Sequence, residues 1–317
     1  MHLHEHTRHR IIMRARGDAC ASTSALFMTH DPLALRTHRP LAHSARRVVV
    51  KLGTAVLVGG GDGNTRWRVD AFVRSLVALQ QSGRDVLLVT SGAVRRGAEL
   101  LGMPVTPAEY AEARLCAAVG QGSLMASYAN AAAQLGASAA QLLLTARDMT
   151  EPRSLAILRS TLSKLLQRRI LPVINENDAL AAPTLPAGEA RTPEYGFGDN
   201  DRLAALLATQ VGADMLLILT DVPGLMTADP RVQPGAQLVP IVQRITPLLV
   251  DAAGGPRLGR GGMRSKLEAA RIATDAGCAV VLADGRDAGI IERVCDGEPV
   301  GTLFLPRPWE APADACA

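Results

Sequence analysis

Residues 86–94 read Val-Leu-Leu-Val-Thr-Ser-Gly-Ala-Val, and the pattern of this segment decides the fold. Its four consecutive apolar residues, Val86–Val89, are typical of a short strand buried on both faces. The small residues that follow predict a turn into a helix, whose first N–H groups and the Ser91 hydroxyl would face an anion. A serine that only caps the helix is the alternative, and the commoner one.

The same order of apolar run, polar turn and helix recurs along the chain. The predicted strands are Val48–Leu52, Val86–Val89, Gln141–Leu144, Ile170–Ile174, Met215–Leu219 and Ala279–Leu282. The predicted helices are Val69–Gln81, Ala108–Leu135, Ser154–Arg168, Arg202–Thr209 and Ser265–Ala276. This alternation predicts an α/β fold with a mostly parallel central sheet and helices on both faces. Because ligands of such sheets bind at the carboxyl ends of strands, the informative residues should follow the apolar runs.

The composition excludes several classes of protein. The chain has 317 residues, 48% of them hydrophobic and 3% aromatic, which is enough apolar material for a globular core. Residues 1–47 carry eight Arg and three acidic residues, so the net charge of +4 comes from this leader and the body is close to neutral. A neutral body argues against nucleic-acid binding. All seven His also lie in the leader, which excludes a His general base, a His metal ligand and a Ser-His-Asp triad from the body.

Three segments are expected along the chain. Residues 1–46 form a leader that is disordered or arises from an upstream start codon, with a transit peptide as the alternative. Residues 47–306 form the folded domain, and residues 307–317 form a short tail. The five cysteines include no C-x-x-C pair, which fits reduced thiols in the cytoplasm, and no apolar run reaches the 18 residues of a membrane span.

Two glycine-rich segments each hold one of the chain's three lysines. Lys51 and the Gly53 turn end the first predicted strand, and residues 259–266 read Gly-Arg-Gly-Gly-Met-Arg-Ser-Lys before a helix. Glycine-rich backbone approaches phosphate closely, and a lysine at a helix start neutralises it. An ordinary turn is the alternative at Gly53. The spacing around Lys266 is not that of a P-loop, and Lys164 is expected to be a solvated surface residue.

Two polar clusters predict a site for an amino acid. Residues 175–178 read Asn-Glu-Asn-Asp directly after an apolar run. Such short amides and carboxylates at the end of a strand can hold both the ammonium and the carboxylate of an amino acid. Residues 198–201 read Gly-Asp-Asn-Asp at the start of a helix, where plain capping is the alternative. Asp201 could also orient lysines or a magnesium ion.

The chain carries, in this order, the segments KLGT, TSGAV, AAVGQ, VINENDA, FGDND, LTDVPGL, TADPR and GGMRSKLEAA. This ordered set resembles the amino-acid kinase superfamily, and within it the branch that phosphorylates the side-chain carboxylate of L-glutamate. The likeness runs from about residue 46 to residue 305. It implies an αβα sandwich of the carbamate-kinase-like type, on which ATP and an amino acid bind side by side at the carboxyl edge of the sheet.

The resemblance also implies roles for individual residues. Those implied in catalysis are Lys51, Lys266 and Asp201, the aspartate organising the two lysines. Those implied in glutamate binding are Ser91, Asp178 and Asn200, supported by Asn175 and Asp199. Those implied in ATP binding are Lys51, Thr220, Asp221, Arg260, Gly261, Gly262, Met263, Arg264, Ser265 and Lys266. Mg²⁺ is expected to arrive mainly through ATP, without a metal site made of protein ligands.

The implied reaction converts L-glutamate and ATP into L-glutamyl 5-phosphate, the first step of proline biosynthesis, in the cytoplasm. A glutamate carboxylate is ionised at neutral pH, so its attack on phosphorus needs no general base and a His-free body suffices. A dimer or tetramer is expected, with the next enzyme of the pathway as a candidate partner and neither nucleic acid nor membrane. The alternatives are another acceptor (aspartate, N-acetylglutamate, UMP or carbamate) and a non-catalytic amino-acid sensor.

The sequence departs from the family's pattern at four places. Arg260 stands where the glycine-rich loop usually has Thr, which questions the nucleotide geometry. Pro223 and Met226 occupy positions that are usually polar and aromatic. Residues 181–195 read as a longer substrate loop. The C-terminal PUA domain of many relatives is expected to be missing.

Overall fold

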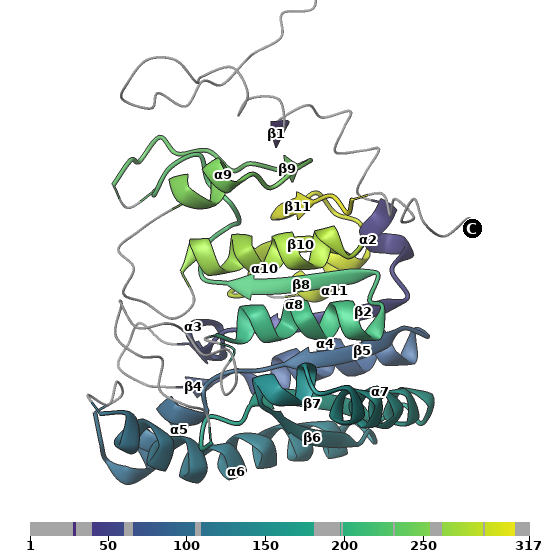
Figure 1. The fold of residues 1–317 in the computed structure, drawn as a ribbon, viewed down its shortest axis with the longest axis vertical. Helices are drawn as coiled ribbons and strands as arrows, with labels where there is room; N and C mark the ends of the chain where they lie inside the picture. The colour runs from purple at the N-terminus through teal and green to yellow at the C-terminus, as the bar shows by residue number, and fades with distance from the viewer. Residues whose placement is uncertain are drawn as a thin grey trace, which may run out of the picture.

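A nine-stranded sheet forms the centre of the computed structural model (Figure 1). The structure describes residues 28–29, 40–59, 66–104, 109–180, 197, 199–230, 232–253, 262–287 and 289–307. In spatial order the described strands are β1 (Met28–Thr29), β9 (Ile241–Val242), β11 (Thr302–Phe304), β10 (Ala279–Asp284), β8 (Met215–Thr220), β2 (Arg47–Leu52), β5 (Asp85–Val89), β7 (Leu171–Glu176) and β6 (Ala139–Leu144).

The six strands from β10 to β6 run parallel to one another and are the six predicted from the sequence. Beyond them β11 is antiparallel to β10, β9 is parallel to β11, and β1 is antiparallel to β9. The predicted α/β fold with a mostly parallel sheet is therefore confirmed. Several strand boundaries differ from the prediction. β6 begins at Ala139, not Gln141, and β10 ends at Asp284, not Leu282. β7 begins at Leu171, not Ile170, and continues through Asn175 and Glu176, which were expected to follow the strand.

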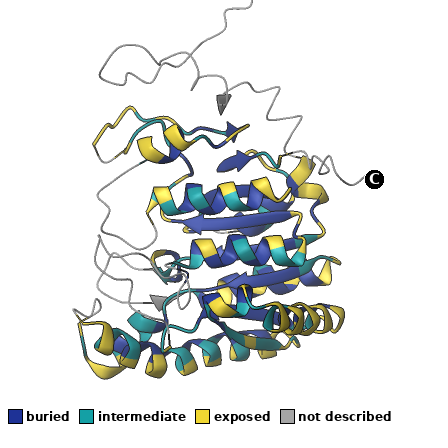
Figure 2. Cartoon of the chain, in the orientation of Figure 1, coloured by how far each residue is buried: buried dark blue, intermediate teal, exposed yellow. Residues whose placement is uncertain are grey.

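Helices cover both faces of the sheet. One face carries α4 (Val69–Gln81), α6 (Tyr110–Gln134) and α11 (Ile290–Cys295), and the other carries α7 (Pro152–Gln167), α8 (Asn200–Val211) and α10 (Met263–Asp275). Alternating residues of β2 separate the two cores: Val48 and Val50 pack with the α4 and α6 side, and Val49 with the α8 and α10 side. Figure 2 shows the result, buried strands between helices whose outer faces are exposed.

The smaller elements lie mainly at the ends of the sheet. They are α2 (Pro40–Ser44), α3 (Thr54–Leu57), α5 (Ala93–Leu101), the 3₁₀ turn η2 (Ala146–Met149), α9 (Pro247–Ala252) and the two-stranded sheet of β3 (Val58–Gly59) and β4 (Arg66–Trp67). The six parallel strands end at the same edge, at the left of Figure 1, where α3 and α5 also lie. Any site built on strand ends therefore belongs at this edge.

Helices α5 and α6 pack backbone against backbone. A Cβ added to Gly97 of α5 would come 1.8 Å from the Cys116 carbonyl oxygen of α6, a distance that no side chain tolerates. Glycine is therefore required for this close approach, which fixes the position of α5 on the longer helix.

Several expectations concern residues outside the described part of the chain: most of the leader, residues 181–195 of the longer loop, and most of the tail. Within the described ranges, no helix is both long enough and apolar enough to span a bilayer. Lys164 is exposed, as expected.

Candidate active site

Three charged side chains meet in a buried cluster at the carboxyl edge of the sheet. Lys51 comes from β2, Asp201 from the first turn of α8 and Lys266 from the first turn of α10. The Lys51 ammonium lies 2.7 Å from Asp201 Oδ1, and the Lys266 ammonium lies 3.1 Å from Asp201 Oδ2. Asp201 is 0% exposed, Lys51 5% and Lys266 7%. The structure thus brings together the three residues predicted to be catalytic.

Two ammonium groups face one carboxylate in this buried cluster. Burial would raise the pKa of the Asp201 carboxyl, but the ammonium groups of Lys51 and Lys266 outweigh it and the pKa is lowered. Asp201 is therefore ionised. Two ammonium groups close together at the end of a strand and the start of a helix favour an anionic ligand beside them.

The start of α10 adds to this anion site. Gly262 precedes the first turn, and Ser265 donates from its hydroxyl to Asp201 Oδ2 at 3.1 Å. The first N–H groups of a helix have no partner inside it and attract anions. Arg264 points its guanidinium to the surface, where Glu268 and Asp251 hold it at 3.0 Å and 3.4 Å. The other predicted ATP contacts of this loop, Arg260 and Gly261, lie outside the described residues, and Met263 begins the helix.

Thr220 and Asp221, predicted ATP contacts, lie at the carboxyl end of β8. Lys51 pairs with Ile218 of β8 and Leu52 with Leu219, so Thr220 follows at the strand end, one residue past this pairing. The Thr220 hydroxyl donates to Asp221 Oδ1 at 3.3 Å. These two polar side chains therefore lie at the same edge of the sheet as the lysine cluster, on the strand next to that of Lys51.

A network of amides lies at the neighbouring strand ends, β5 and β7. Asn200 Nδ2 lies 2.9 Å from each of three acceptors: the Thr90 carbonyl, the Ser91 hydroxyl and Asn175 Oδ1. Asn200 Oδ1 is buried and has no hydrogen-bond partner among the described residues. Because buried polar atoms are nearly always paired, this oxygen indicates a site for a donor from a ligand.

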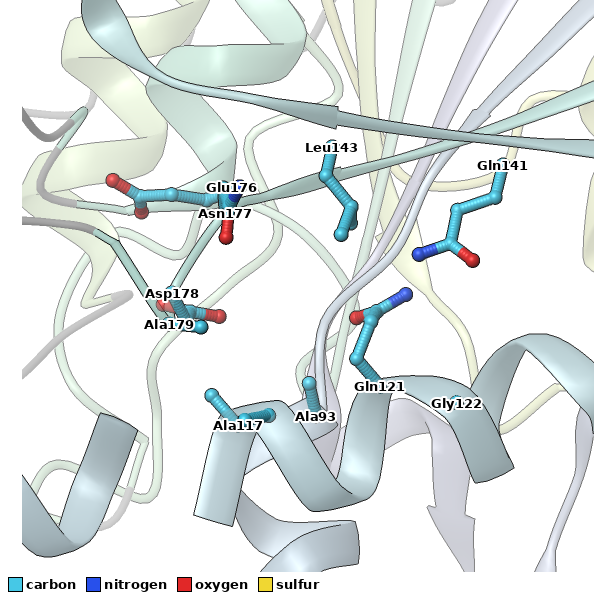
Figure 3. A pocket seen from close by; sticks show the side chains of 11 residues that line it. Ala93, Ala117, Gln121, Gly122, Gln141, Leu143, Glu176, Asn177, Asp178 and Ala179 are labelled. Atoms are coloured by element: carbon cyan, nitrogen blue, oxygen red, sulfur yellow. The ribbon is translucent and has the colours of Figure 1, made fainter. Parts of the chain in front are cut away.

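A cavity of about 260 Å³ adjoins this network, between α6 and the ends of β6 and β7 (Figure 3). Its polar lining residues are Gln121, Gln141, Glu176, Asn177 and Asp178. It brings the predicted substrate residue Asp178 next to the amide network. The Glu176 carboxylate already accepts one hydrogen bond, from the backbone N–H of Phe197 to Oε1 at 2.8 Å.

The structure places one predicted substrate residue in a capping role. The Asp199 carboxylate accepts the N–H of Arg202 at 2.9 Å and so caps α8. This is the alternative weighed from the sequence. The structure also adds Gln121 and Thr90, which sequence reasoning missed. The AAVGQ segment was a signal for Gln121, but no local pattern pairs it with Asn175.

No group of three or more His, Cys, Asp or Glu side chains within the described residues could hold a metal ion. Both oxygens of Asp201 are taken by lysines. A divalent cation here would thus depend on oxygens that a ligand brings, such as those of a nucleotide phosphate chain.

Comparison with known proteins agrees with this geometry. The model of the amino acid kinase family matches residues 46–284. The chain belongs to this family. Its family relatives include the glutamate 5-kinase of Deinococcus radiodurans, 48% identical over 82% of this chain and 69% of that protein. The glutamate 5-kinase of Proteus mirabilis is 44% identical over 82% and 69% of the two chains, and that of Methylococcus capsulatus 41% over 83% and 68%.

The fold of the family is also seen in a solved structure, the UMP kinase of Bacillus anthracis. It superposes with a TM-score of 0.53 at 17% identity, covering 83% of this chain and 97% of that one. The family predicted from the ordered motifs is confirmed, and so is the predicted resemblance to glutamate kinases within it.

Proposed function

We propose that this family member is a glutamate 5-kinase, which transfers the γ-phosphoryl group of ATP to the side-chain carboxylate of L-glutamate. The product is L-glutamyl 5-phosphate, and the reaction opens proline biosynthesis. Relatives of that name, 40–48% identical, support the assignment. The observation that carries it is the buried cluster of Lys51, Asp201 and Lys266, in which two ammonium groups share one carboxylate.

The lysines supply what phosphoryl transfer requires. The γ-carboxylate of glutamate is already ionised at neutral pH, so it attacks phosphorus without a general base. The barrier then depends on alignment and on stabilising the charge of the transferring oxygens. Lys51 and Lys266 place two ammonium groups there, and Asp201 holds both in position. When bound, Mg²⁺ adds further charge stabilisation on the oxygens of the phosphate chain.

The amide network is the proposed site for the amino-acid end of glutamate. The unpaired Asn200 Oδ1 and the Asp178 carboxylate offer acceptors to an ammonium group. The Ser91 hydroxyl and the first N–H groups of α5 offer donors to the α-carboxylate. Gly92, which precedes α5, has φ of 107°, a left-handed conformation that favours glycine and points the turn at this site.

The proposal is tested by ADP release from the purified chain with ATP and Mg²⁺, using glutamate, aspartate, N-acetylglutamate and UMP as acceptors. Glutamate should be the selective acceptor, and hydroxylamine should trap the acyl phosphate as a hydroxamate. Selective turnover of another acceptor would contradict the assignment, and so would glutamate binding without turnover.

Two lysine variants sharpen this test. Lys266→Met should remove most turnover, whereas Lys164→Met should retain it, because Lys164 is exposed on α7 away from the cluster. Equal activity of the two variants would show that the lysine cluster does not carry the reaction.

We also infer that the enzyme works in a reducing compartment, the cytoplasm. Cys116, Cys278 and Cys295 are free and buried. Burial raises the pKa of Cys278 to about 12 and that of Cys295 to about 11, so both remain protonated and unreactive thiols.

A further inference from the structure

Gln121, on the helix α6, is bonded to the amide network although it lies outside the strand ends that form it. Its Oε1 accepts a hydrogen bond from Asn175 Nδ2 at 2.9 Å. We propose that Gln121 is a positioning residue: it fixes the orientation of the Asn175 side chain, through it that of Asn200, and so sets the affinity for the amino-acid acceptor. This proposal rests on the proposed function, because it concerns the same acceptor site.

The hydrogen bonds form a chain with one direction. The backbone N–H of Glu176 donates to Asn175 Oδ1 at 2.9 Å. A backbone N–H can only donate, so the Asn175 atom facing it must be the oxygen, and the other atom of that amide must be the nitrogen. Asn175 Nδ2 therefore donates, and the atom of Gln121 that meets it must be Oε1.

The same reasoning runs from Asn175 to Asn200. Asn175 Oδ1 also accepts from Asn200 Nδ2, which in addition reaches the Thr90 carbonyl and the Ser91 hydroxyl. With the nitrogen of Asn200 fixed on this side, its oxygen must face the other way, which is where Oδ1 stands buried and unpartnered. The acceptor offered to a ligand's ammonium group thus depends on the orientation of the Asn175 amide, which the Glu176 N–H holds at its oxygen and Gln121 at its nitrogen.

Gln121 is well placed to anchor this chain because α6 is itself held firmly. The helix spans 25 residues and is packed against α5 at the close contact between Gly97 and Cys116. Seven residues after Gln121, the same helix presents Tyr128, whose hydroxyl lies 2.7 Å from Thr90 Oγ1. One rigid helix therefore supports both Asn175 and the turn that carries Ser91.

The other end of the Gln121 amide faces the cavity. Figure 3 shows the amides of Gln121 and Gln141 projecting into it, the first from α6 and the second from β6. A matched control lies outside the cavity: Gln134, the last residue of the same helix α6, is exposed.

The first experiment compares Gln121→Met with Gln134→Met in the ADP-release assay. Methionine keeps the length of glutamine but removes the accepting oxygen, leaving Asn175 Nδ2 unpaired. Gln121→Met should raise the KM for glutamate about tenfold, with the KM for ATP unchanged. Gln134→Met should leave both KM values unchanged. Equal KM values for Gln121→Met and wild type, or an equal rise in Gln134→Met, would overturn the proposal.

A double-mutant cycle with Asn175→Ala separates positioning from direct contact. If Gln121 acts through Asn175, adding Gln121→Met to Asn175→Ala should change the KM for glutamate by less than about twofold. A further tenfold rise would mean that Gln121 acts on the substrate directly, and would overturn the proposal. Gln121→Ala, which cannot overpack, repeats the test if Gln121→Met does not fold. Absence of glutamate turnover in the wild type would instead count against the proposed function.

Discussion

Gly120 of α6 lies directly against Ala93, the first residue of α5. A Cβ added to Gly120 would come 2.0 Å from the Ala93 carbonyl oxygen and 2.4 Å from the backbone nitrogen of Gly97. Both of those atoms are backbone, so neither can move aside without moving α5. Because Ser91 and the anion-facing turn directly precede α5, the contact at Gly120 sets where that turn stands relative to the amide network.

Gly120→Ala is therefore expected to damage both stability and substrate binding. Overpacking of this kind costs about 1–3 kcal/mol of unfolding free energy, and the shift of α5 should raise the KM for glutamate. Gly122→Ala is the control. Nothing lies within 4 Å of a Cβ added at Gly122, and alanine is the better helix former, so this variant should be neutral or slightly stabilising. Urea denaturation of both variants decides, and equal midpoints would show that the close contact is unimportant.

The lysine cluster predicts that replacing Asp201 costs more stability than replacing Lys266, although Lys266 is the residue that turnover requires. Asp201→Asn removes the carboxylate that two buried ammonium groups share, and breaking such pairs costs about 3–5 kcal/mol. Lys266→Met leaves a balanced pair of Lys51 and Asp201, so it should cost less stability and yet lower kcat by about 10²–10³. Denaturation and steady-state kinetics of both variants test this order. The reverse ranking in stability would mean that Asp201 does not balance both lysines.

Much of this fold could be predicted from the sequence because its central strands are buried on both faces. Such strands appear as uninterrupted apolar runs, and the helix at Val69–Gln81 has the bounds that its pattern predicts. The short strands β9 and β11, between β1 and β10, were not predicted. They have two and three residues, too few to show a period. The end of β7 was misplaced because Asn175 and Glu176 are polar residues in a buried strand, kept there by side-chain hydrogen bonds.

The candidate site was predictable only where its residues follow strands or begin helices. Lys51, Asp201 and Lys266 stand at such positions, and the family resemblance grouped them. Gln121 and Tyr128 lie in the middle of α6, and their partners are 54 and 38 residues away along the chain. The sequence of α6 is rich in Ala and Gly and shows no strong apolar face, so only the folded arrangement indicates that these two side chains serve the site.

The lowered pKa of the Asp201 carboxyl also predicts how the free energy of unfolding depends on pH. Its pKa is lower in the folded chain than in the unfolded chain, so its contribution is fully present above the ordinary carboxyl pKa of about 4. That contribution is lost as the pH falls through the lower folded pKa. The wild type should therefore lose unfolding free energy below about pH 4 more steeply than Asp201→Asn. Denaturant titrations from neutral to acidic pH measure both slopes, and parallel curves would contradict the charge assignment.

The buried pair of Tyr128 and Thr90 gives the final prediction. Both are 0% exposed, and burial raises the pKa of the Tyr128 phenol, which therefore stays protonated. The Thr90 hydroxyl also reaches the Ser91 carbonyl at 3.3 Å, so it keeps a partner when the phenol is removed. Tyr128→Phe should therefore cost only about 1 kcal/mol of unfolding free energy.

Thr90→Val has the opposite consequence, because it leaves the buried phenol without the partner seen in the structure. The cost should reach about 1–3 kcal/mol, and the double variant should be more stable than Thr90→Val alone, since replacing both partners removes the unpaired group. Urea denaturation of the two single variants and the double variant completes the cycle. If the two changes were simply additive, the hydroxyl pair would not be coupled, and Tyr128 would support the Ser91 turn by packing alone.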